Sequence, residues 1–361
     1  MHVGDGERPA EAETRPVSGV ANVWLVWRAI AASLVAALQP VAPAVLLLWL
    51  PPLVAILGRL PGSDQPGHTA LSMPALMVGG IAPLWVAAGW ARLRGRSLAG
   101  MIQLLRAHGW LGARPLRFVI LAFTLTVFFG SFANWKSAIP LFYPGFPLDV
   151  PLESLEIWVH GDHADRLLHG LFGSPGAILL LDRIYHTWFY MLFALVIWQA
   201  WDGDHRRLRQ FWMAFALTWI VLGIFVATAV ASAGPIYAGL DRGSGSYDDL
   251  LARLNAAEAL APLFVRVSAW SLWEAARQPG ISIGDGISAF PSLHVAVASL
   301  ATFAMWRVHP MVGLIGAGYA LLILVASIML GWHYALDGEA GILGAALIWM
   351  ATNRWARRLD S

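Results

Sequence analysis

The sequence predicts an all-α integral membrane protein, a helical bundle of about eight transmembrane helices with one further helix at the membrane interface. The 361-residue chain has a mean hydropathy of +0.62. Only 13% of its residues are charged, against about one quarter in an average soluble domain. Several apolar stretches reach the roughly 20 residues needed to cross a bilayer, and many of the 19 tryptophans stand near their ends, which is typical of interfacial anchoring.

The charge and cysteine counts exclude several kinds of site. A formal net charge of +2 is too small to indicate nucleic acid as a partner. Because the chain has no cysteine, disulfides and thiolate metal sites are excluded. Residues 1–20 are polar and lack any period, so they predict a disordered cytoplasmic tail and not a signal peptide.

The apolar stretches define two groups of helices. Residues 21–115 are expected to form accessory N-terminal membrane helices, namely an interfacial or tilted helix from Val23, spans at Val41–Leu57 and Ala70–Ala91, and an interfacial segment at Leu98–Trp110. Residues 116–353 are expected to form the main membrane domain. Its first span ends near Trp135, and the others are Ala177–Trp201, Phe211–Ser232, Ala289–Trp306, Met311–Trp332 and Gly338–Thr352.

The arginines predict how these spans are oriented. They gather in the short segments 92–117, 206–209, 307 and 354–358. With the spans above, all four segments fall on one side, which the positive-inside rule identifies as cytoplasmic. Both termini, including a basic tail over residues 354–361, are therefore expected in the cytoplasm, and the long loops are expected to face the outside or periplasm.

Two motifs between Gly284 and Gly341 carry the candidate chemistry. Residues 290–294 (Phe-Pro-Ser-Leu-His) enter one apolar run, and residues 331–337 (Gly-Trp-His-Tyr-Ala-Leu-Asp) follow the next. A chain that crosses the membrane and returns brings His294 and His333 to the same side. Asp337 follows His333 by four residues, so on a helix the two share a face. The carboxylate can then hold one imidazole nitrogen and leave the other free to attack.

These motifs resemble those of the type 2 phosphatidic acid phosphatase superfamily, which are K-x6-R-P, P-S-G-H and S-R-x5-H-x3-D. Lys136 begins a match to the first, residues 291–294 match the second, and His333 with Asp337 matches the third. The F-P-S-L-H and H-Y-x-x-D forms are closer to the inositol phosphorylceramide synthase-like branch. The Ser232-Ala233-Gly234-Pro235 turn also resembles that branch.

The chain departs from the family patterns at positions that bind phosphate. Tyr143 replaces the arginine of the first motif, Leu293 replaces a glycine, and Ala326-Ser327 replaces the Ser-Arg of the third motif. Two arginines are therefore missing, although a phosphoryl group needs cationic donors as it transfers. We expect Arg183 to supply this charge, with Arg277 behind it. A structural ion pair between Arg183 and Asp182 is equally open.

The resemblance implies a metal-independent enzyme without a cofactor, a phosphatase or phosphotransferase acting on a lipid- or polyprenyl-linked phosphate at the extracytoplasmic face. His333 would form a phosphohistidine, Asp337 would fix its tautomer, and His294 would donate a proton to the leaving oxygen. The residues expected to bind the phosphate are Lys136, Ser292, Arg183 and Tyr143. A proton-coupled transporter and a catalytically inactive scaffold of the same fold remain as alternatives.

Overall fold

The structure is a computed structural model that describes residues 19–57, 112–143, 145–241, 243, 245–277 and 286–359. All regular secondary structure in these ranges is helical, in agreement with the predicted fold class. The predicted span at 70–91, the interfacial segment at 98–110 and nearly all of the N-terminal tail lie outside the described residues. The last helix continues to Arg358, so the described part of the predicted basic tail extends this helix.

The first two helices meet at a sharp bend. Helix α1 (Gly19–Leu38) and helix α2 (Ala42–Leu57) are separated by a break at which their axes differ by 77°. The break follows from Pro40, which lacks an N–H and disfavours helical backbone at the residue before it. Helix α2 then lies along helix α5 (Ala113–Phe142), where the Trp49 indole donates to the Thr124 hydroxyl at 3.4 Å.

Long helices form the body of the molecule. Among the described residues, four helices are long and apolar enough to cross a membrane, and the bent α1–α2 pair makes a fifth if it counts as one span. The four spans are Ala113–Ile139, Pro175–Ala200, His205–Ala229 and Pro310–Met329. The predicted number of about eight is not confirmed and stays a prediction. Large apolar side chains such as Leu46 and Ile315, each 69% exposed, fit an outer surface that faces lipid.

The body also contains helix α9 (Pro175–Ala200), helix α10 (His205–Leu217), the π-helix η1 (Thr218–Val226), helix α11 (Ala227–Ala229), helix α15 (Leu293–Trp306), helix α16 (Pro310–Met329) and helix α17 (Ala335–Arg358). Helices α10, η1 and α11 run on as one span. Helix α15 is a shorter apolar helix. It begins at Leu293, later than predicted, because Ser292 is its N-cap.

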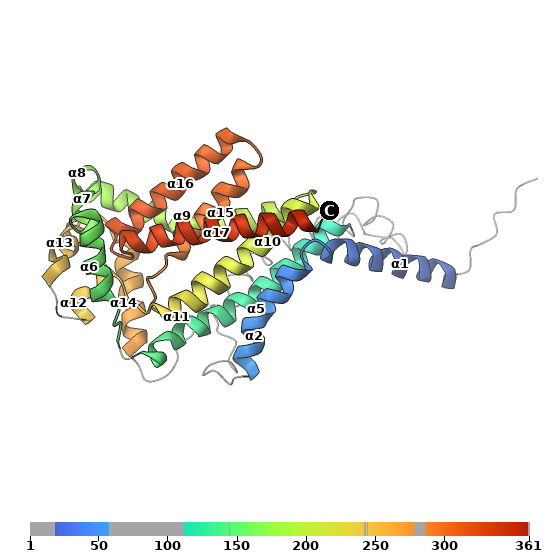
Figure 1. Cartoon of the computed structure of the whole chain (residues 1–361), viewed down its shortest axis with the longest axis horizontal. Helices are drawn as coiled ribbons and strands as arrows, with labels where there is room; N and C mark the ends of the chain where they lie inside the picture. The colour runs from blue at the N-terminus through green and yellow to red at the C-terminus, as the bar shows by residue number, and fades with distance from the viewer. Residues whose placement is uncertain are drawn as a thin grey trace, which may run out of the picture.

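Short helices gather at one end of these long helices, and we call them the cap (Figure 1). The cap consists of α6 (Asp149–His160), α7 (Ala164–Leu167), α8 (His169–Phe172), α12 (Ala238–Asp241), α13 (Asp248–Glu258) and α14 (Phe264–Arg277). The sequence predicts long loops here, one extending to Pro175 and one over residues 233–288, but the structure contains these helices. Acidic residues in the segment of α6 favour an exposed loop, but Asp149 and Glu156 are 1% and 2% exposed and face inward.

Arginines mark the end of the bundle opposite the cap. Arg117, near the start of α5, is 2% exposed and donates to the backbone carbonyls of Ala200 and Asp202 at 3.2 and 2.9 Å. Arg307, which follows α15, hydrogen-bonds the side chain of Gln210. The described arginines of the predicted segments around 117, 206–209 and 307 therefore come together at this end of the molecule.

Candidate active site

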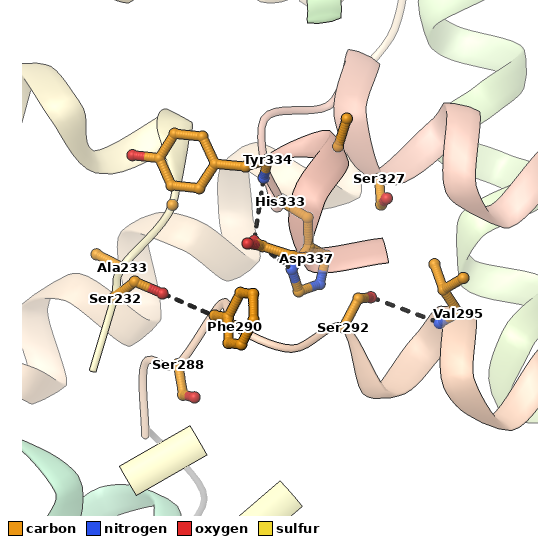
Figure 2. A network of polar contacts seen from close by, with 12 residues as sticks. Ser232, Ala233, Ser288, Phe290, Ser292, Val295, Ser327, His333, Tyr334 and Asp337 are labelled. Atoms are coloured by element: carbon orange, nitrogen blue, oxygen red, sulfur yellow. Dashed lines mark hydrogen bonds and ion pairs between the residues drawn. The ribbon is translucent and has the colours of Figure 1, made fainter. Parts of the chain in front are cut away.

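His333 and Asp337 form a hydrogen-bonded pair at the start of α17. His333 Nδ1 lies 3.2 Å from Asp337 Oδ2, and the same oxygen accepts the backbone N–H of Tyr334 at 3.0 Å. Figure 2 shows both contacts. The spacing produces this geometry because an acidic residue at the third position of a helix accepts from the N-cap backbone. A carboxylate only accepts, so Nδ1 carries the proton and Nε2 keeps its lone pair.

Burial protects this pair from bulk water. Asp337 is fully buried and His333 is 8% exposed. Among the described residues, no hydrogen-bond partner is found for Asp337 Oδ1. The carboxylate therefore makes its contacts through one oxygen, which serves both the imidazole and the helix N-terminus.

His294 lies in the first turn of α15 and faces the same region. Its ring centroid is 6.4 Å from that of His333. It stacks on Tyr185 at 4.8 Å, and the Trp188 indole donates to the His294 carbonyl at 2.9 Å. Helix α9 thus fixes both the ring and the backbone of His294.

The two histidine motifs are also tied together through their backbones. The N–H of Ser292 donates to the carbonyl of Asp337 at 2.9 Å. One turn further along α17, a Cβ at Gly341 would come within 2.6 Å of the Ser292 carbonyl oxygen. Glycine at this position therefore lets the first turn of α17 approach the start of α15.

A cavity of about 310 Å³ joins the two histidines to Lys136. Its lining comes from α5, α9, η1, α14, the segment 233–237 and the two motifs, and includes Phe132, Lys136, Tyr185, His186, Trp188, Gly223, Tyr237, Ser288, His294, Trp332 and His333. Lys136 Nζ donates to the Ser288 carbonyl at 3.3 Å. Asp337 lies behind His333 and is absent from the described lining. The cavity thus combines one lysine and three imidazoles, those of His186, His294 and His333, with a largely aromatic wall.

Ser292, Arg183 and Tyr143 are not among the described residues that line this cavity. The Ser292 hydroxyl is buried and accepts the Val295 N–H at 3.4 Å, as Figure 2 also shows. Tyr143 packs against the small cluster of Ile139, Ala227 and Ala231.

Arg183 makes all of its described contacts outside the cavity. It pairs with Asp182 at 3.0 Å, donates to the Pro262 carbonyl at 2.7 Å and lies 4.2 Å over the ring of Phe264. Asp182 is fully buried and accepts the backbone N–H groups of Phe264 and Val265 at 3.0 and 2.9 Å. Together these contacts attach the start of α14 to α9. The side chain of Arg277, its expected support, lies outside the described residues.

Two acidic residues of α6, which the sequence did not identify as site residues, hydrogen-bond the segments next to His333 and Asp337. Asp149 accepts the N–H groups of Ala233 and Gly234 at 2.8 and 3.0 Å and the Tyr334 hydroxyl at 2.9 Å. Glu156 accepts the N–H of Ala335 at 2.6 Å. Their spacing of seven residues is two helical turns. This spacing places both residues on one face of a helix, and it is the sequence signal that could have identified them.

A comparison with known families agrees with this geometry. A family model described as the PAP2 superfamily matches residues 151–351, more than half of the chain. The chain therefore belongs to this superfamily of phosphoric-ester hydrolases. No curated protein and no solved structure matches it. The matched range holds His294, His333 and Asp337, while Lys136 lies before it. Membership supports a helical, membrane-embedded protein of the lipid phosphatase type.

Proposed function

We propose that this protein is a membrane-embedded lipid phosphatase or phosphotransferase that acts on a lipid- or polyprenyl-linked phosphate through a phosphohistidine. The observation that carries the proposal is the 3.2 Å contact between His333 Nδ1 and Asp337 Oδ2, made where His333, His294 and Lys136 line one cavity. This arrangement offers a nucleophile, an acid and a cation to a single phosphorus atom.

In the first step, the lone pair of His333 Nε2 attacks the phosphorus. The new N–P bond forms as the bond to the leaving oxygen breaks. His294, held in its protonated form by the negative charge of the bound phosphate, gives its proton to that oxygen. Asp337 holds the Nδ1 proton and stabilises the positive charge that the ring gains. Burial of the pair strengthens this interaction because the local dielectric constant is low.

In the second step, an acceptor hydroxyl attacks the phosphohistidine. Its proton passes to the now neutral His294, the N–P bond breaks, and the electron pair returns to Nε2 of His333. Both histidines are then restored to their starting protonation states. Water as the acceptor gives a phosphatase, and an alcohol gives a phosphotransferase. The F-P-S-L-H and H-Y-x-x-D forms of the motifs favour the alcohol, as in the inositol phosphorylceramide synthase-like branch.

The phosphoryl group would lie between Lys136 and the start of α15. Lys136 supplies a positive charge, and the first N–H groups of a helix bind anions favourably. We assign Arg183 to the attachment of α14, because its described contacts are with Asp182, Pro262 and Phe264. Ser292 would act through its cap on α15 and not through its own hydroxyl.

The cavity would open at the extracytoplasmic face. The support for this orientation is the cluster of arginines at the opposite end of the bundle, around Arg117 and Arg307. Positive side chains are enriched on the cytoplasmic side of membrane proteins. The apolar wall of the cavity would hold the first part of the lipid chain.

The proposal is tested with purified protein in detergent on a panel of lipid phosphates and polyprenyl phosphates, with and without alcohol acceptors. We expect release or transfer of phosphate by the unmodified protein and its loss in His333→Ala and Asp337→Asn. His160→Ala is the matched control, because His160 pairs with Glu339 at 2.9 Å away from the described cavity. Unchanged turnover in His333→Ala would reject the site. Gradient-driven uptake by the protein reconstituted in lipid vesicles, without phosphate release, would favour the transporter.

A further inference from the structure

Two neighbouring polar groups of the cavity wall have no hydrogen-bond partner among the described residues. Among the described residues, neither the Tyr237 hydroxyl nor the Trp332 indole N–H, both buried, has a hydrogen-bond partner. Both residues line the cavity that holds His294 and His333. Buried donors are nearly always paired in folded proteins, because an unpaired one loses its bonds to water without replacement. Two such donors in one cavity indicate a ligand that accepts from them.

The two donors stand on backbone segments that are bonded to each other. The N–H of Ile236 donates to the Gly331 carbonyl at 2.8 Å, which fixes the residues before Tyr237 and Trp332 side by side. Gly234 has a φ of +102°, and a Cβ there would lie 2.6 Å from the Trp332 carbonyl oxygen. Asp149 holds this turn through the Gly234 N–H at 3.0 Å.

The side chains are also fixed in place. The Tyr237 ring stacks on Trp273 at 5.4 Å and meets the Trp332 ring at 6.4 Å in an edge-on arrangement. Tyr237 is 1% exposed. Burial raises the pKa of its phenol above the ordinary value, so it keeps its proton and remains a donor. Trp332 directly precedes His333, which places this pair of donors next to the proposed nucleophile.

The cavity has few cationic groups to bind a phosphate, and these two donors can bind its oxygens as well. Lys136 is the one lysine or arginine among the described lining residues, and the two motif arginines of the family are replaced in this chain. A phosphoryl group presents several oxygens that must each be satisfied during transfer. We propose that the Tyr237 hydroxyl and the Trp332 N–H bind the phosphoryl oxygens of the substrate, in place of those arginines. This inference rests on the proposed function.

The Trp219 N–H is also buried without a described partner in the cavity wall, but we leave it out of this pair. Trp219 packs edge-on against Phe129 and Phe132, with ring centroids 4.7 and 5.0 Å away. It lies on η1, away in sequence from both histidine motifs. Its surroundings are those of the apolar part of the wall.

The test uses Tyr237→Phe, which removes only the hydroxyl. Three quantities are measured on the full chain in detergent: the unfolding temperature, the affinity for orthovanadate as a mimic of the transferring phosphoryl group, and KM and kcat on a lipid phosphate. Because the hydroxyl has no described partner in the free protein, its loss should leave the unfolding temperature unchanged or raise it. Vanadate affinity should fall by roughly 10- to 100-fold, the effect of one hydrogen bond to a charged group.

Tyr247→Phe is the matched control, because its hydroxyl bonds His163 Nδ1 at 2.9 Å outside the described lining. This change should lower the unfolding temperature and leave vanadate affinity unaltered. Trp332→Phe provides a second, independent loss of a donor and should also weaken vanadate binding.

Three outcomes would overturn the inference while leaving the proposed function intact. The first is a change in vanadate affinity of less than twofold in both Tyr237→Phe and Trp332→Phe. The second is a rise in KM for the lipid alone, which would mean that the donors bind the alcohol portion. The third is an equal loss of vanadate affinity in Tyr247→Phe. If the unmodified protein neither binds vanadate nor cleaves lipid phosphates, the proposed function fails, and this inference fails with it.

Discussion

Glu156 and Ala335 are joined by a 2.6 Å hydrogen bond from the Ala335 backbone N–H to Glu156 Oε1. This contact connects the cap to the first turn of α17, two residues before Asp337. Glu156 is 2% exposed. Burial raises its pKa from the ordinary 4.5 to about 7, with the charge of Asp337 adding to the rise and the Ala335 N–H opposing it. A buried carboxyl group with a raised pKa therefore supports the backbone next to the proposed dyad.

This pKa predicts that the protein becomes less stable between pH 4.5 and 7. In that range the folded protein keeps the Glu156 proton while the unfolded chain loses it, so rising pH favours unfolding. Above about pH 7 the glutamate is ionised in both states, and its contribution stops changing. Glu156→Gln keeps an acceptor for Ala335 without the charge, so this decline should be smaller in the variant by up to roughly 3 kcal/mol.

The measurement is the unfolding temperature in detergent from pH 4.5 to 8 for both proteins. Asp249→Asn provides a control in the cap, since the side chain of Asp249 is 73% exposed. Parallel curves for the unmodified protein and Glu156→Gln would contradict the assignment of this proton to Glu156.

The contacts of Asp182 and Arg183 predict a structural role for this pair. Asp182→Ala would leave the N–H groups of Phe264 and Val265 without their acceptor, at a cost of about 1–3 kcal/mol each when buried. Arg183→Gln should lower the unfolding temperature by less and keep KM within about threefold, because the Arg183 side chain is 39% exposed and Asp182 keeps its two backbone N–H donors. A tenfold or larger rise in KM in Arg183→Gln would show instead that this guanidinium binds substrate phosphate.

Arg117 is predicted to stabilise the end of the bundle opposite the cap. Its buried guanidinium donates to carbonyls of Ala37, Ala200 and Asp202, and so joins α1, α5 and the end of α9. In Arg117→Met these acceptors lose a charged donor, and we expect destabilisation of roughly 2–4 kcal/mol with turnover retained at low temperature. Arg114→Met, at an exposed position of the same helix, should have no such effect; equal unfolding temperatures for both variants would contradict this role.

Local patterns in the sequence were sufficient for the parts of the site close together in the chain. The spacing of His333 and Asp337 correctly predicted their contact, although only Asp337 lies in the first turn of α17 and His333 directly precedes its N-cap. Long apolar stretches located α9, α16 and most of the other long helices. The break between α1 and α2 follows from the backbone restriction that Pro40 imposes. The family resemblance at superfamily level is confirmed by the match over residues 151–351.

Long-range contacts explain what the sequence left open. The sequence predicts a loop around Asp149 and Glu156, because nothing local shows that their partners are Tyr334 and Ala335, 185 and 179 residues away. The proposed role of the Tyr237 hydroxyl and the Trp332 N–H likewise depends on two segments, distant in the sequence, that meet at one cavity. The choice between a phosphate site and an ion pair for Arg183 also depended on contacts with a loop far along the chain.

The central claim is that His333 carries the phosphoryl group between two half-reactions. The most direct measurement is rapid acid-free quenching of the purified protein with a ³²P-labelled lipid phosphate, followed by mapping of the labelled residue. We predict an acid-labile, base-stable phosphate on His333 in the unmodified protein that is absent in His333→Ala. Turnover of substrate with no label on His333, or label that persists in His333→Ala, would contradict the account.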